Sequence, residues 1–187
     1  KVLAFRDPFM ASLHYDYIQE FLPLWRTLRA FDAKGVFQII GIANLPLILE
    51  SIAEARNAGS PEAVCEHVRR RLGFQLVAEI RREDGTVPLL QLSPEWEDTF
   101  SARQVEGERG MADVALPPDK FNRLAANVAE KISRAGEKGI FPAVVTSSRR
   151  RRFLRTVLGA KGISAPVLSF DELGFDTRPS IVGMVAA

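Results

Sequence analysis

The sequence has very few residues of the types that build disulfides, metal sites and catalytic triads. Its 187 residues include one cysteine, Cys65, and two histidines, His14 and His67. A single cysteine cannot form an internal disulfide, which fits a reducing compartment, and we expect Cys65 to be a buried structural thiol. These three residues do not supply the four ligands of a structural zinc site or a Ser-His-Asp or Cys-His arrangement. We therefore expect no metal site, no cofactor and no catalytic residues.

Long apolar runs and a strong charge imbalance are also missing. The longest apolar-rich stretch, 36–49, is interrupted by Gln38, Asn44 and Pro46 and is shorter than the ~20 residues that a membrane-spanning helix needs. The net charge is only +2, which does not by itself indicate a nucleic-acid partner. Because the first residue is Lys1 and not methionine, we expect a fragment of a longer protein.

Capping residues and apolar spacing predict a mainly helical first half. Asn44 and Ser60 are natural N-caps, and each is followed by a proline in the first turn, where the missing N–H costs little. His67 is expected to be half-buried on the helix that follows Ser60. The expected helices are 16–31, kinked at Pro23; 45–55; 61–72; and a short helix after Ser93 and Pro94.

Strands are expected between and after these helices. The apolar stretches 74–81 and 87–92 flank the turn residues 83–85, an arrangement that predicts a β-hairpin. The polar stretch 102–111 contains two glycines and is expected to be a loop or linker.

The last third of the chain is typical of an α/β unit. After a helix over 118–135, the sequence predicts a buried strand ending near Thr146, a helix, a second strand over 166–169, and a third over 181–185. We therefore predict a multi-subdomain α+β fold with a helical segment, a β-hairpin and a compact C-terminal α/β module. The expected domains are 1–43, an N-terminal helical segment; 44–110, a helical subdomain with the hairpin; and 111–187, the C-terminal α/β subdomain.

A serine pair precedes the helix of this α/β module. Ser147 and Ser148 follow a buried strand, and Arg149 comes next; amides at a helix N-terminus and a nearby arginine attract anions. The glycines and lysine of a P-loop are absent, and serine is a common N-cap residue, so capping is the preferred interpretation. A nucleotide- or phosphate-binding enzyme that uses these three residues remains the alternative.

The densest positive charge in the chain follows directly and consists of Arg149, Arg150, Arg151 and Arg152. Four arginines at the start of a helix oppose its dipole, so helix stability does not explain them. The stems of the first two can cover the edge of the core, while the last two are expected to be exposed. We interpret the run as a contact surface for an acidic protein partner. An RNA-binding adaptor is a further alternative, although no RNA-binding aromatic pattern accompanies the arginines and no nucleic acid is expected.

Other polar and aromatic clusters have structural explanations as well as functional ones. Glu95, Glu97 and Asp98, and the pair Asp171 and Glu172, lack a nearby acid–base partner, so we expect them to be solvated or to cap helices. Aromatic residues gather near the N-terminus, where core packing competes with a hydrophobic groove for a partner segment. These candidate partner-binding residues are Tyr15, Tyr17, Phe21 and Trp25.

Three blocks of sequence, in this order, resemble the type III export-gate family, which comprises a flagellar biosynthesis protein and its injectisome counterparts. The blocks are 44–54 with 66–72, then 87–96, then 142–148 with 152–155 and 166–173. The resemblance covers about residues 36–187 and corresponds to the C-terminal cytoplasmic domain of that family. Residues 159–163 resemble the flagellar branch more than the injectisome branch.

This resemblance implies a role in protein export and no enzymatic activity. The family's cytoplasmic part forms a nonameric ring at the cytoplasmic face of the bacterial inner membrane, and its membrane segments are absent from this chain. The resemblance implies that the ring receives export substrates with their chaperones, as well as the stalk protein of the ATPase complex. It also places residues 1–35 where the chaperone-binding subdomain of the family lies.

Overall fold

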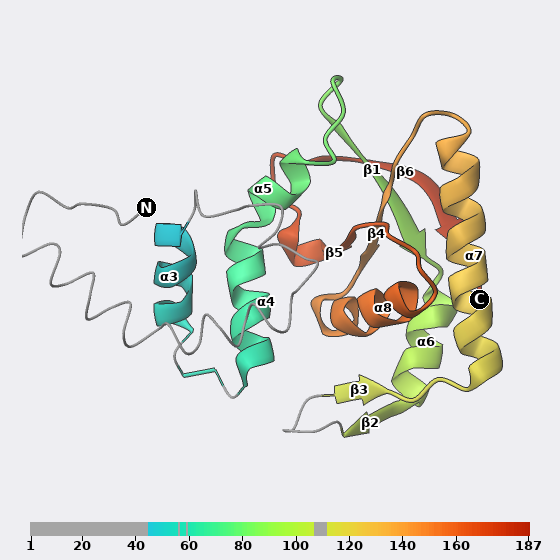
Figure 1. Cartoon of the computed structure of the whole chain (residues 1–187), viewed down its shortest axis with the longest axis horizontal. Coiled ribbons are helices and arrows are strands. Elements are labelled where there is room, and N and C mark those ends of the chain that lie inside the picture. Colours follow the sequence, from blue (N-terminus) through green and yellow to red (C-terminus); the bar gives the residue numbers. More distant parts are fainter. Residues whose placement is uncertain (1–44, 56, 59, 107–111) are drawn as a thin grey trace, which may run out of the picture. The chain divides into compact units, whose positions relative to one another are not determined.

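The computed structural model describes residues 45–55, 57–58, 60–106 and 112–187 (Figure 1). The chain divides between Leu72 and Gly73 into two compact units. The helix expected over 16–31 and the expected domain 1–43 lie outside the described residues. In the described part, helices combine with a parallel sheet, which confirms the predicted mixture of elements.

The first unit contains α3 (Leu45–Glu54) and α4 (Pro61–Arg71), which pack against each other. Both helices were expected from the sequence. The Ser60 hydroxyl accepts a hydrogen bond from the amide of Ala63 at 3.2 Å, so Ser60 is the N-cap of α4. Cys65 is buried, as expected for a structural thiol, and His67 is half-buried.

A polar cluster at the surface joins α3 and α4. His67 Nε2 lies 3.0 Å from Glu54 Oε2, and Arg71 Nη2 lies 3.3 Å from the other oxygen of the same carboxylate. Exposed pairs of this kind contribute roughly 0–1 kcal/mol each. The buried apolar residues Ile48, Ile52 and Val68 therefore stabilise the unit more than its surface charges.

A four-stranded sheet forms the centre of the second unit. Its strands are β1 (Thr86–Leu92), β4 (Ala143–Thr146), β5 (Val167–Ser169) and β6 (Arg178–Val185). The order is β5-β4-β1-β6, and every neighbouring pair is parallel (Figure 1). β4 and β5 are buried along their whole length, as is usual for parallel strands covered on both faces.

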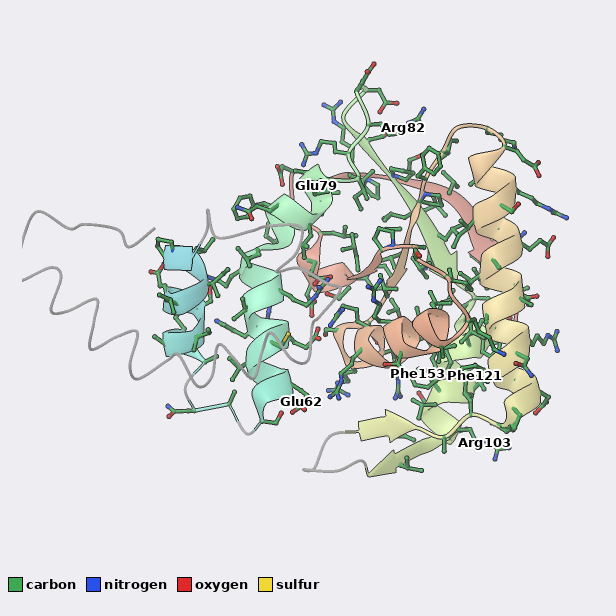
Figure 2. The ribbon with its side chains drawn as sticks, viewed as in Figure 1. Glu62, Glu79, Arg82, Arg103, Phe121 and Phe153 are labelled. Atoms are coloured by element: carbon green, nitrogen blue, oxygen red, sulfur yellow. The ribbon has the colours of Figure 1, made fainter. Side chains whose placement is uncertain are left out.

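Three helices cover one face of this sheet: α6 (Pro94–Ala102), α7 (Pro118–Gly136) and α8 (Ser148–Ala160). Leu90, Val144 and Val167 occupy adjacent registers on three strands and point into the same core cluster. The cluster also contains apolar residues of all three helices, and Phe121 and Phe153 pack against it (Figure 2). The helix predicted over 118–135 and the strand–helix–strand order of the C-terminal module are confirmed.

The predicted β-hairpin is wrong in its first arm. Residues Gly73–Ala78 form the short helix α5, and within the described ranges the following strand β1 pairs with the distant strands β4 and β6 alone. In α5 the buried positions are Gly73, Leu76 and Val77, which are spaced as on one face of a helix. Short apolar runs of this kind do not distinguish a strand from a helix by their pattern.

The expected loop over 102–111 is also corrected in part. β2 (Gln104–Glu106) pairs antiparallel with β3 (Ala112–Val114), and the residues between them lie outside the described ranges. Strands of three residues are too short to show an alternating pattern in the sequence. The expected domain boundary between residues 110 and 111 falls inside the second unit, where it separates β1 from the strands with which it pairs.

A short 3₁₀ helix, η3 (Phe170–Glu172), begins the connection from β5 to β6. The Glu172 carboxylate is 2% exposed and accepts a hydrogen bond from the amide of Ser169 at 2.6 Å. Glu172 and Ser169 form a capping box, which confirms the capping interpretation for Glu172, while Asp171 is exposed. Helix α5 packs against η3 at this point.

A pH dependence is expected at the turn before β1, near Arg82 (Figure 2). The Thr86 hydroxyl and amide donate to Asp84 Oδ1 at 2.6 and 2.9 Å, which lowers the pKa of Asp84 from its ordinary value of 3.8. A lowered folded-state pKa stabilises the fold at neutral pH, and this contribution is lost as the pH falls through the lowered value. We expect the chain to be more stable than Asp84→Asn at pH 7 in urea titrations, with the difference vanishing at pH values below 3.8. A difference that stays constant with pH would contradict this assignment.

Candidate functional site

The arginine run lies on the first two turns of α8, directly after the buried strand β4. Arg149 and Arg152 are exposed, whereas Arg150 and Arg151 are only 6% and 7% exposed. Arg150 Nη2 donates to Gln104 Oε1 of β2 at 3.1 Å. The prediction that Arg151 is exposed is therefore wrong, and the run separates into two buried and two exposed arginines.

Helix periodicity explains this separation. The buried residues of α8 after the run are Leu154, Val157 and Leu158, and positions three and four residues before Leu154 lie on the same face of the helix. Those positions are Arg150 and Arg151. The apolar stripe of α8, extended backwards by one turn, passes through both positions, and the packing of this first turn in the fold decides that both side chains are buried.

The exposed arginines Arg149 and Arg152 have the chemistry to bind carboxylates. Arg149 and Arg152 are three residues apart on α8, so their side chains leave neighbouring points of one helix face. A guanidinium group is always charged and presents a planar fork of donors that matches a carboxylate. Within the described ranges, Arg149 forms no ion pair with an acidic residue, so its exposed guanidinium can bind an acidic side chain of another molecule.

The carboxyl edge of the sheet is not suited to an anion. Ser147 occupies the N-cap position of α8, as expected, although its hydroxyl makes no capping bond. The hydroxyl of Thr146 donates to Glu97 Oε1 at 3.2 Å, which holds a carboxylate of α6 beside the end of β4. A phosphate at this edge would be repelled by Glu97, so the geometry disfavours the phosphate-binding alternative for Ser147, Ser148 and Arg149.

The two long helices end in the same way. Gly139 after α7 and Gly162 after α8 have φ of +69° and +71°, in the left-handed region that favours glycine. The amide of the isoleucine after each glycine donates to a carbonyl in the last helical turn, at 3.0 and 2.9 Å. This common lysine-glycine-isoleucine cap turns the chain toward β4 in one case and β5 in the other. This cap was not predicted from the sequence.

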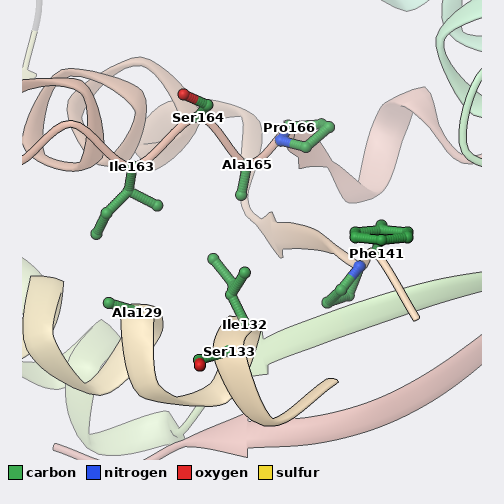
Figure 3. A pocket seen from close by; sticks show the side chains of 9 residues that line it. Ala129, Ile132, Ser133, Phe141, Ile163, Ser164, Ala165 and Pro166 are labelled. Carbon is green, nitrogen blue, oxygen red and sulfur yellow. The ribbon is translucent and has the colours of Figure 1, made fainter. Parts of the chain in front are cut away.

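An apolar groove lies between the segments that follow these two caps. It has a volume of about 440 Å³ and is lined by residues of α7, by Phe141 and Pro142, and by residues 163–166. Ile163 and Ala165 point across it toward Ile132 of α7 (Figure 3). Phe141 is 76% exposed at its rim. No pattern in the sequence indicates this groove, because its walls come from segments that are distant along the chain.

Other candidate residues cannot be placed in a site. Tyr15, Tyr17, Phe21 and Trp25 lie outside the described residues. Glu95 and Asp98 are exposed on α6, as expected for solvated acids. Exposed phenylalanines that sequence analysis did not single out are Phe74, Phe141, Phe170 and Phe175.

Within the described ranges, no three acidic, histidine or cysteine side chains gather as a metal site would require. In the same part of the chain, no helix combines the length and the hydropathy of a membrane span.

Comparison with known proteins identifies the family. The sequence pattern of the FHIPEP family matches residues 35–178. The chain belongs to the FHIPEP family. One relative of this FHIPEP chain is the flagellar biosynthesis protein FlhA of Caulobacter vibrioides, which is 33% identical over 147 residues. That match covers 78% of the chain and 21% of the relative. The FlhA of Bacillus subtilis is 22% identical over 154 residues, covering 82% of the chain and 23% of the relative.

Solved structures share the fold of this FHIPEP chain. The Chlamydia pneumoniae CdsV protein superposes with a TM-score of 0.69 at 20% identity, over 94% of this chain and 53% of that one. Nonameric SctV-C of EPEC superposes with a TM-score of 0.68 at 16% identity, over 94% and 55%. The chain thus spans about a fifth of the curated relatives' length, as the 21% coverage of the Caulobacter FlhA shows, and just over half of the solved chains.

Proposed function

We propose that this chain is part of the cytoplasmic docking platform of a type III protein export gate. The observation that carries the proposal is the FHIPEP match over residues 35–178 together with the fold shared with solved relatives. One of these is described as the nonameric EscV cytosolic domain from the type III secretion system. In this proposal the chain presents surfaces to other proteins and catalyses no reaction.

The flagellar branch is favoured because the FlhA proteins of Caulobacter vibrioides, Bacillus subtilis and Treponema pallidum are among the relatives. The full-length protein is then anchored in the bacterial inner membrane by segments outside this chain, with the described units on the cytoplasmic side. The nonameric relatives support a homo-nonameric ring. Rings of this kind need two different contact surfaces on each subunit, because each copy contacts its neighbours head to tail.

Two kinds of partner follow from this role. A structure of the complex of Chlamydia pneumoniae CdsV with CdsO supports a second protein bound to the platform, which we propose to be the stalk protein of the ATPase complex. Export chaperones with their substrates are the second kind. For them the proposed contact residues are Tyr15, Tyr17, Phe21 and Trp25, since aromatic residues supply much of the binding energy where a hydrophobic groove receives a partner segment.

The exposed arginines of α8 are the proposed contact for an acidic partner. Arg149 and Arg152 remain accessible, while the buried Arg150 and Arg151 belong to the packing of α8 against the rest of the unit. Exposed charges at an interface mainly raise the association rate and set partner preference. This division assigns binding to two arginines of the run and structure to the other two.

The variant Arg149→Glu tests this assignment. A glutamate in the first turn of a helix interacts favourably with the dipole, so we expect stability to stay constant or to rise by about 0.3–1 kcal/mol. Binding of an acidic partner should weaken by about tenfold at low salt, and by less as salt screens the charges. Calorimetric titration with the stalk protein and with chaperone–substrate complexes at two salt concentrations measures the effect.

The matched control is Lys138→Glu, which makes the same charge change beyond the end of α7, at the opposite end of β4. Equal weakening by both variants would indicate a general charge effect and contradict a specific contact at Arg149. Unchanged binding with every partner tested would remove α8 from the proposed docking surface.

The proposed function itself is tested with the complete protein. A strain from which the gene has been deleted should export flagellar substrates when it carries the complete gene. It should fail to export them when it carries a gene that lacks the coding region for 45–187. Particle mass from electron microscopy of the purified cytoplasmic part should correspond to nine copies. A thermal shift of several degrees with a nucleotide, without any effect of the deletion on export, would overturn the proposal in favour of a nucleotide-binding enzyme.

A further inference from the structure

We draw no further inference here: the strongest candidate, the apolar groove between α7 and the segment 163–166 that leads into β5, is an unpartnered apolar surface, and nothing in the structure shows what covers it.

Discussion

Replacing Trp96 by alanine is expected to lower the free energy of unfolding by about 3–5 kcal/mol, the range for large aromatic residues in a packed core. Trp96 is fully buried in the core cluster and stacks on Phe100, with ring centroids 5.8 Å apart. Its indole Nε1 donates to the carbonyl of Ala186 at 2.9 Å, which ties the end of β6 to α6. Denaturant titration followed by near-UV circular dichroism measures the loss.

The variant Trp96→Phe separates packing from hydrogen bonding. A phenylalanine keeps most of the buried aromatic surface and removes the indole N–H. The carbonyl of Ala186 still accepts from Asn127 Nδ2 at 2.9 Å, so it is not left unsatisfied. We therefore expect a smaller loss of about 1–2 kcal/mol for this variant. Equal effects of the two variants, or a loss below about 1 kcal/mol for Trp96→Ala, would contradict the placement of α6 in the core.

The variant Gly73→Ala is expected to destabilise the second unit by about 1–3 kcal/mol through overpacking. A Cβ atom at position 73 would lie 2.4 Å from the backbone oxygen of Glu172 and 3.0 Å from its carbonyl carbon. Such contacts are with backbone, which cannot turn away as a side chain can. The capping box of η3, which includes the buried Glu172 carboxylate, holds that backbone in place. Thermal unfolding should show a lower midpoint.

The matched control is the same substitution at Gly159, near the end of α8. A Cβ atom there meets nothing within 4 Å, and alanine is a better helix former than glycine. Gly159→Ala should therefore stabilise the protein by about 0.5–1 kcal/mol. The same chemical change is thus expected to have opposite signs at two helical positions. If both variants were stabilising, the close approach of α5 to η3 would be disproved.

Elements with their own local signals could be predicted from the sequence. Helix α7 begins at the second of two prolines and has an apolar stripe with helical spacing, and its predicted range 118–135 matches Pro118–Gly136 closely. The N-cap of α4 at Ser60 was predicted for the same reason. Buried strands of the C-terminal module were recognised because parallel strands covered on both faces are continuously apolar.

Elements whose identity depends on distant partners could not be predicted. The segment 73–78 has an apolar content that suits either a strand or a helix, and its packing against η3 decides in favour of the helix. β1 looked like one arm of a hairpin because the nearest apolar run seemed its natural partner. In the fold, its partners come about 50 and 90 residues later in the chain, as the pairs Leu89–Ala143 and Leu89–Ile181 show.

The candidate site on α8 could likewise be predicted only in part from the sequence. The arginine run was visible in the sequence, and the start of α8 was correctly predicted, yet the burial of Arg151 was not. Its position on the helix was given by periodicity, but the sequence alone did not show which face of α8 packs inward at its first turn. The hydrogen bond from Arg150 to Gln104 joins α8 to β2, a strand that the sequence analysis interpreted as a loop.

Local chemistry by itself determined where most of the described helices of this FHIPEP chain begin and end, because capping residues, prolines and apolar spacing act within a few residues. The order of blocks along the chain also sufficed for the resemblance to the export-gate family. Only the tertiary structure decided the parallel order β5-β4-β1-β6 and which two of the four arginines reach solvent. The physical reason is that burial and strand pairing are properties of contacts between distant segments, and a linear pattern does not specify which segments meet.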